Sequence, residues 1–288
     1  MDLVIYGLIN SLYLSLIAIG FALVYGVSRV PNFAHGAFYV LTGCLSWLFL
    51  NRWGLSYPLC IVLSVALTTL AGILTYQLVI IRVRGMPISE IIASFAIGLA
   101  ILEAFRMAGF RGPQYSLPKF ADGMVEIFGT PVDLQRIILV GVGILLIIVL
   151  QVFTHYTRIG LGLRAIAQDE PAALMLGIDS DMAATVAMAI GSAVVGVAAS
   201  VILPLGTITV EAGYDVLIFA LAVCIVGGLG SWAGAVVASF VIGYAQIITV
   251  RYIAPHFQIV VAMAAIVLIL IIKPSGLFGR QKELEDRV

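Results

Sequence analysis

Long apolar runs constrain this chain more than any other feature. Its 288 residues are 62% hydrophobic and 10% charged, with a mean hydropathy of +1.16. One soluble core could not bury so much apolar surface, so we expect an integral membrane protein. A helix crosses the hydrocarbon with about 20 apolar residues, and several runs reach that length without a charge. The alternating pattern of a membrane barrel is absent, which predicts an all-α, polytopic helical bundle.

The chain is expected to cross the membrane eight or nine times and to form a single transmembrane domain over 1–288. If the short second apolar segment crosses fully, Met1 lies outside; if it dips in and returns, Met1 lies inside and eight helices span. The nine segments are 3–27, 34–50, 57–81, 91–108, 134–153, 182–205, 216–226, 235–250 and 257–272.

Basic residues gather in three connections and so indicate the orientation. Arg82 and Arg84 flank one connection, and Arg158 and Arg164 lie in the loop 155–181. The polar tail 273–288 holds Lys273, Arg280, Lys282 and Arg287. Since cytoplasmic loops carry an excess of Lys and Arg, we place all three in the cytoplasm and the near-neutral loop 109–133 outside. Fifteen basic and fifteen acidic residues cancel overall, which argues against a polyanionic partner such as nucleic acid.

The loop 155–181 is the most polar stretch of the chain and carries the signals of one short helix. Glu170 can act as N-cap, Pro171 fits the first helical position, and Gly177 fits the left-handed position after the end. These signals predict a helix over 171–176, roughly 9 Å long. Such a helix is not stable alone, so it packs on the bundle or a partner, or lies on the membrane surface.

The faces of this short helix are expected to differ. Ala172, Ala173 and Leu176 can face a partner or the bundle. Leu174 and Met175 present adaptable apolar surface. After the helix, either of two aspartates, at positions 179 and 181, can cap the next membrane span, because the helix dipole favours a negative group there.

Two interruptions of the apolar pattern stand in opposite halves of the chain. The segment 28–38, SRVPNFAHGAF, contains Pro, Asn, His and Gly, and the segment 227–235, GGLGSWAGA, contains four glycines. Paired interruptions of this kind are typical of an inverted repeat, in which discontinuous helices line a path. Tight loops or small-residue packing faces are the alternative.

The chain offers no sign of a nucleotide, metal or catalytic site. A phosphate-binding loop ends in Gly-Lys-Ser or Gly-Lys-Thr, whereas Lys119, Lys273 and Lys282 follow Pro, Ile and Gln. We therefore expect that the chain does not hydrolyse ATP and binds no cofactor. No histidine has a second ligand at i+3 or i+4, so no metal site is expected. The three cysteines lie far apart in apolar segments and are expected to pack as small residues.

Ionisable residues near the apolar segments are few. Glu103 and Arg106 lie three residues apart at the outer end of a segment and are expected to form a structural ion pair. A proton-coupled carrier would be expected to bury an unpaired carboxylate in mid-span, and no segment offers one. A membrane enzyme would need a polar cluster at interface depth, which the sequence also lacks.

Four motifs together carry a resemblance to a known family. They are ALVYGVSRVPNFAHGAF at 22–38, GLGLRAIAQDEPAALMLGID at 160–179, VGGLGSWAGA at 226–235 and KPSGLFG at 273–279. The chain resembles the permease subunits of ABC importers, most closely those of the branched-chain amino-acid transport (LivH-type) family. The resemblance covers nearly the whole chain.

The resemblance implies roles for particular residues. In ABC importers a short cytoplasmic permease helix docks on the ATPase, and 172–177 looks like the Ala-Ala-x-x-x-Gly core of that loop. The family pattern places Glu directly before the two alanines, whereas here Pro171 follows Glu170. The residues implied in ATPase coupling are Arg164, Asp169, Glu170, Pro171, Ala172, Ala173, Leu174, Met175 and Gly177. Those implied near the substrate path are Asn32, Phe33, His35, Gly36, Gly227, Gly228, Gly230 and Ser231; for His35, a capping or interhelical hydrogen bond is the alternative.

The resemblance also implies a heteromeric complex in the bacterial inner membrane, surrounded by lipid. The chain would stand beside a second, related (LivM-like) permease, above two ABC ATPase subunits that hydrolyse ATP with Mg, and below a periplasmic solute-binding protein. It would move branched-chain or other amino acids from that protein to the cytoplasm. The alternative is a secondary transporter of small polar solutes driven by an ion gradient.

Overall fold

The computed structural model describes residues 1–110 and 115–279. The end of the predicted polar tail and four residues of the outer loop therefore lie outside the described part. The elements are α1 (Asp2–Ser28), α2 (His35–Asn51), α3 (Tyr57–Thr75), the π-helix η1 (Tyr76–Ile80), α4 (Ile81–Val83), α5 (Pro87–Met107), β1 (Met124–Ile127), β2 (Thr130–Asp133), α6 (Leu134–Tyr156), α7 (Arg158–Gln168), α8 (Glu170–Met175), α9 (Ser180–Ile202), η2 (Leu203–Leu205), α10 (Ala212–Gly227), α11 (Trp232–Tyr252), η3 (Pro255–Phe257) and α12 (Gln258–Ile272).

The described chain runs from one end of the bundle to the other nine times. Seven helical stretches are long and apolar enough to cross a membrane, with α3 to α4, α9 to η2, and η3 to α12 each counted as one. To these seven are added two shorter helices, α2 with 17 residues and α10 with 16, each preceded by non-helical backbone, at 29–34 and 206–211. The predicted polytopic helical bundle with discontinuous helices is confirmed, and of the two predicted topologies the structure has the one with nine crossings.

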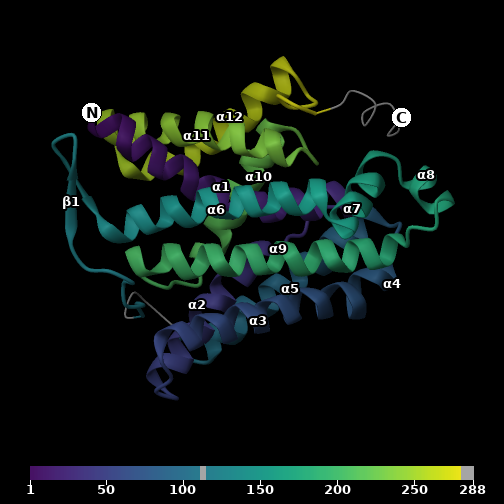
Figure 1. Cartoon of the computed structure of the whole chain (residues 1–288), viewed down its shortest axis with the longest axis horizontal. Helices are drawn as coiled ribbons and strands as arrows, with labels where there is room; N and C mark the ends of the chain where they lie inside the picture. Colours follow the sequence, from purple (N-terminus) through teal and green to yellow (C-terminus); the bar gives the residue numbers. More distant parts are fainter. Residues whose placement is uncertain (111–114, 280–288) are drawn as a thin grey trace.

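Contacts of α1 identify the two ends of the bundle (Figure 1). Near its start, the Tyr6 hydroxyl donates to the Pro131 carbonyl in the β1–β2 hairpin at 2.9 Å. Just after its end, the Arg29 guanidinium donates to the Ala167 carbonyl in α7 at 2.9 Å. Met1 therefore lies at the hairpin end, opposite α7 and α8, as expected if the second segment crosses fully.

The two discontinuous crossings enter from opposite ends and meet inside the bundle. A Cβ on Gly36, in the first turn of α2, would lie 1.9 Å from the Gly213 carbonyl oxygen in the first turn of α10. Conversely, a Cβ on Gly213 would lie 3.1 Å from the Gly36 oxygen. The two helices thus begin at the same level and run apart, one toward the hairpin end and one toward the α8 end. This opposite polarity is the arrangement expected of an inverted repeat.

The prediction that 227–235 is the counterpart of the segment 28–38 in the second half was wrong. Residues 227–235 form the turn between α10 and α11 and lie beside the last turn of α1, where a Cβ on Gly26 would be 3.2 Å from the Gly230 oxygen. The true counterpart of 29–34 is 206–211, GTITVE, which precedes α10. It has only one glycine and several β-branched residues, and the predicted segments 182–205 and 216–226 left it as an ordinary connection.

The helix α1 forms the centre of the bundle. In its most apolar window 83% of residues are buried, against 6% in the stretch Pro255–Ile272 that contains α12. Polar side chains join α1 to α11: the Ser15 and Ser239 hydroxyls are hydrogen-bonded, and the Asn10 amide donates to Gln246 Oε1 at 3.0 Å. All three cysteines are free and buried, in keeping with a packing role.

We expect Gly36→Ala to destabilise the bundle. Its methyl group would overlap the backbone of α10, and overpacking of this kind costs about 1–3 kcal/mol. The melting temperature of the purified protein in detergent should fall. Gly141→Ala in α6 is the matched control, because a Cβ there meets nothing within 4 Å. Equal melting temperatures for the two variants would contradict the close crossing of α2 and α10.

Candidate functional site

The loop after α6 holds two short helices, where the sequence predicted only one. In front of α7, the Thr157 side chain accepts a hydrogen bond from the Gly160 amide at 3.0 Å. Gly160 and Gly162 both disfavour a helix, so α7 was not predicted. Gly160 is needed because a Cβ there would lie 2.1 Å from the Phe153 carbonyl oxygen, where α7 folds back onto α6.

The helix α8 begins one residue earlier than predicted. Its N-cap is Asp169, whose carboxylate accepts from the Ala172 amide at 3.0 Å. The prediction that Glu170 is the N-cap was therefore wrong, and Pro171 takes the second helical position. The prediction of a left-handed residue after the helix is confirmed, since Gly177 has a φ of +80°.

One face of α8 is anchored in the bundle and the other is open. Ala173 is 2% exposed and packs in a small apolar cluster with Val27 of α1 and Leu163 of α7. The helix lies at one extremity of the molecule (Figure 1), and the three apolar residues after Ala173 are exposed. We call these the apolar tip: Leu174, Met175 and Leu176, which are 49%, 91% and 80% exposed.

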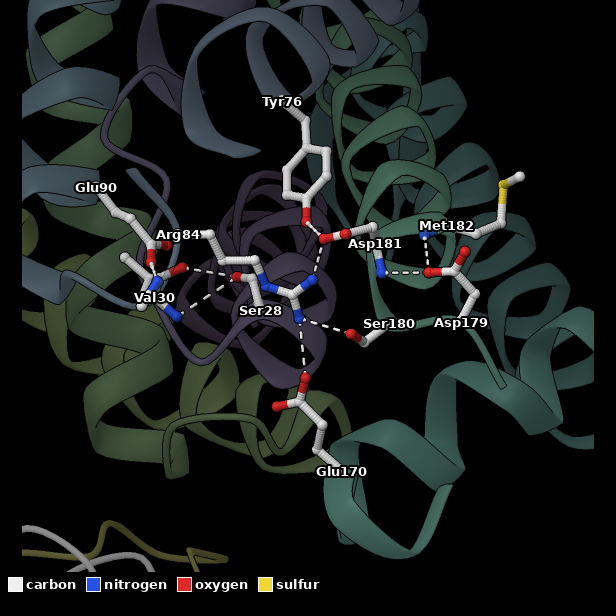
Figure 2. A network of polar contacts seen from close by, with 11 residues as sticks. Ser28, Val30, Tyr76, Arg84, Glu90, Glu170, Asp179, Ser180, Asp181 and Met182 are labelled. Atoms are coloured by element: carbon white, nitrogen blue, oxygen red, sulfur yellow. Dashed lines mark hydrogen bonds and ion pairs between the residues drawn. The ribbon is translucent and has the colours of Figure 1, made fainter. Parts of the chain in front are cut away.

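Glu170 is held by an arginine from another part of the chain (Figure 2). Its Oε1 accepts from Arg84 Nη2 at 2.8 Å. The same guanidinium forms an ion pair with Asp181 and donates to Ser180 Oγ at 2.9 Å. The Tyr76 hydroxyl donates to Asp181 Oδ1 at 3.1 Å. Arg84 therefore joins α8, the first turn of α9 and the end of the α3–η1–α4 span.

The charge of Arg84 is favoured by its surroundings. Partial burial disfavours the charged guanidinium, but the Tyr76 hydroxyl and the carboxylates of Asp181 and Glu170 outweigh it and raise the pKa of Arg84 above its usual value. The sequence had identified Arg84 only as a marker of the cytoplasmic side. Asp181 is free to pair with it because Asp179 caps α9, accepting from the Met182 amide at 3.2 Å.

The segment 29–34 is fixed by side chains of α5 and α9. Asn32, 5% exposed, donates to Met188 Sδ in α9 at 3.2 Å and accepts from the Ala34 amide at 3.0 Å. The Phe33 amide donates to Ser94 Oγ in α5 at 3.1 Å. These bonds replace the backbone bonds that a continuous helix would have made.

His35 lies in the packed core. It is 1% exposed, its Nε2 is 2.8 Å from the Ile17 carbonyl oxygen of α1, and its ring meets Phe21 edge-on at 5.5 Å. Of the two roles considered for it, the structure contains the interhelical hydrogen bond. Gly36 beside it serves the close crossing with α10 described above.

The glycine-rich turn lies beside α7 and away from His35. Gly230 and Ser231 line a cavity of about 290 Å³ together with Arg164 of α7. Ser231 also caps α11, accepting from the Gly234 amide at 3.0 Å, while Gly227 packs directly on Gly234 and Gly228 has a φ of +101°. The His35 ring meets α1 at Phe21 and the turn meets it at Gly26, roughly 7–8 Å further along the helix. Pro31 of the first predicted path segment and Leu229 of the turn line a common cavity.

We expect Asp169→Ala to loosen α8, because loss of an N-cap costs about 1 kcal/mol. Backbone amides of 170–178 should exchange hydrogen faster in the purified protein. Asp169→Asn is the matched control, since its amide oxygen can still accept the hydrogen bond from Ala172. Equal exchange in the two variants would show that the cap does not stabilise α8.

A solved structure shares the fold. PsaBC from Streptococcus pneumoniae, in complex with Fab, matches with a TM-score of 0.52 over 100% of this chain and 96% of that chain. The sequence identity is 12%, so the likeness concerns the fold alone.

Curated relatives match over nearly their whole length. The high-affinity branched-chain amino acid transport system permease protein LivH of Escherichia coli K12 is 28% identical over 92% of this chain and 91% of its own. The corresponding protein BraD of Pseudomonas aeruginosa is also 28% identical, over the same shares. A probable branched-chain amino acid transport permease protein LivH of Methanocaldococcus jannaschii is 26% identical over 95% of this chain and 90% of its own.

A family model matches residues 3–272, from the second residue of α1 to the last of α12. Its description is branched-chain amino acid transport system, permease component. With seven long apolar helices in the described part, the chain is a multi-pass protein of the inner membrane. The motifs pointed to this family from the sequence, and the match over the full set of helices establishes that the chain belongs to the permease components of branched-chain amino acid transport systems.

Proposed function

We propose that this permease component is driven through its apolar tip by an ABC ATPase subunit and imports branched-chain amino acids. The observation that supports this most directly is the tip itself. Met175 and Leu176 are 91% and 80% exposed on a helix whose other face is anchored by Ala173. Burying a Leu or Met side chain stabilises a contact by about 1.5–3 kcal/mol, so an apolar groove on a partner would hold this tip.

The energy for transport would come from partner subunits. Each lysine of the chain follows Pro, Ile or Gln instead of the glycine of a phosphate-binding loop, so ATP and Mg are assigned to two ATPase subunits and no cofactor to this chain. A second, related permease would complete the membrane part, and a periplasmic solute-binding protein would deliver the substrate. The substrate class follows the names of the relatives, which are branched-chain amino acid permeases.

ATP binding would close the ATPase pair and move α8 with it. The bundle would then switch between inward-open and outward-open states, with chemistry confined to the ATPases. We place the substrate path near the segment 32–36 and the turn 227–231, where small and weakly polar residues predominate. Selectivity would then rest mostly with the binding protein.

We expect Met175→Asp to weaken ATPase docking, because it places a charge where the partner presents an apolar surface. The ATPase subunits should be lost when the tagged permease is purified from membranes. Phe128→Asp is the matched control: Phe128 is 81% exposed, but lies on the hairpin at the opposite end of the bundle. Full retention of the ATPases by Met175→Asp would refute docking through the tip.

Transport should require ATP and the binding protein. In proteoliposomes holding the whole complex, we expect leucine uptake only when ATP reaches the ATPases and the binding protein is present on the other side. An ionophore that collapses ion gradients should leave the uptake unchanged. Uptake that continues without ATP and stops with the ionophore would instead identify a gradient-driven carrier.

A further inference from the structure

Two series of contacts connect Arg84 to the non-helical segment 29–34, one through α5 and one through α9. One connection passes through α5. The Gly85 amide, next to Arg84, donates to Glu90 Oε1 at 2.9 Å, and Glu90 is 5% exposed in the first turn of α5. One helical turn later, Ser94 Oγ accepts the hydrogen bond from the Phe33 amide at 3.1 Å.

The other connection passes through α9. Arg84 pairs with Asp181 in the first turn of α9, and two turns later Met188 Sδ accepts from the Asn32 amide at 3.2 Å. The same stretch of α9 is packed against η1, whose Tyr76 and Ile80 form a buried cluster with Val24, Ala184 and Met188. A π-helical turn inside a long helix is often found at a functional site. Here it brings the Tyr76 hydroxyl to Asp181 while its ring remains buried.

We propose that Arg84 is a positioning residue that transmits the movement of α8 to the segment 29–34, by holding Glu170, Asp181 and the α3–η1–α4 span as one unit. The proposal rests on the docking of α8 proposed above. Without Arg84, α8 would be held to α9 only by residues 176–179 and by the apolar cluster around Ala173, so less of its movement would reach α5 and the segment 29–34. The bundle would then switch less often for each ATP hydrolysed.

The geometry suits this role better than a role in stability. The side chains of Arg84, Glu170 and Asp181 are 32%, 37% and 47% exposed, and ion pairs at such positions contribute little to folding. A guanidinium can bind two carboxylates in a fixed orientation, which a lysine ammonium cannot. The arrangement therefore fixes the relative position of α8 and α9 more than it stabilises either helix.

The test measures leucine imported per ATP hydrolysed by the whole complex in proteoliposomes. We expect Arg84→Gln to retain its ATPase subunits and to hydrolyse ATP, while leucine imported per ATP falls about tenfold, within the usual range of coupling between sites. Arg84→Lys should lie between Arg84→Gln and the wild type. Arg82→Gln is the matched control, since Arg82 is exposed in the same connection and loses the same charge.

A covalent link in place of the Arg84–Glu170 ion pair tests whether Arg84 transmits the movement of α8 or only stabilises the folded protein. We expect the double variant Arg84→Cys, Glu170→Cys to be as poorly coupled as Arg84→Gln. A short bis(methanethiosulfonate) reagent forms a disulfide with each thiol and releases a sulfinate each time. This link should restore leucine imported per ATP, and its cleavage by a thiol reductant should abolish the gain again. The three natural cysteines are buried and so are protected from the reagent. Should the Arg84 variants fail to insert, Glu170→Ala provides the same comparison with Arg84 and Asp181 intact.

Three results would overturn the inference. The first is normal leucine import per ATP in Arg84→Gln or, where that variant does not insert, in Glu170→Ala. The second is loss of the ATPase subunits from Arg84→Gln, which would make Arg84 part of docking. The third is a cross-linked pair that stays uncoupled. If Met175→Asp releases the ATPases while any of these holds, docking through the tip stands and only the role of Arg84 fails.

Discussion

The structure depends on satisfying backbone hydrogen bonds where the chain leaves helical form inside an apolar bundle. Hydrocarbon supplies no water to an unpaired amide, so non-helical backbone at this depth needs partners from the protein. In the segment 29–34 those partners are the side chains of Asn32 and Ser94. In 206–211 the Ile208 amide donates to the Tyr115 carbonyl at 2.7 Å, and the Thr209 hydroxyl accepts from the Ala212 amide. Each broken crossing is therefore hydrogen-bonded both within itself and to a distant part of the chain.

The same constraint explains why glycines stand where the broken helices meet. Both α2 and α10 begin beside the other's backbone, and no side chain fits between Gly36 and Gly213. Without a hydrophobic driving force between membrane helices, such close approach is what holds them together. A bundle assembled from these contacts is closely packed at its centre, so a switch between two states must move whole helices.

The sequence was sufficient to predict the class of fold, because hydropathy alone reports which segments cross the membrane. It also located α8, since Pro171 and Gly177 have fixed backbone requirements. It did not identify 206–211 as the start of a broken crossing, because a break after Pro204 and Gly206 is equally typical of an ordinary loop between two helices. Nor could it pair Arg84 with Glu170, 86 positions apart, because that contact exists only once α3 and α9 have packed together. The contacts that the sequence could not reveal form only when distant segments pack together in the folded chain.

The position of Glu170 on α8 follows from the proline that comes after it. A proline between the acidic residue and the two alanines moves the carboxylate back by one residue, which on a helix is a rotation of about 100°. The N-cap falls to Asp169, and Glu170 turns toward Arg84 and away from the side that carries Met175. The apparent departure from the family pattern thus has a structural consequence. It separates Met175, the most exposed residue of the apolar tip, from the residue that binds Arg84, whereas Leu174, about one turn after Glu170, remains on the same side of α8.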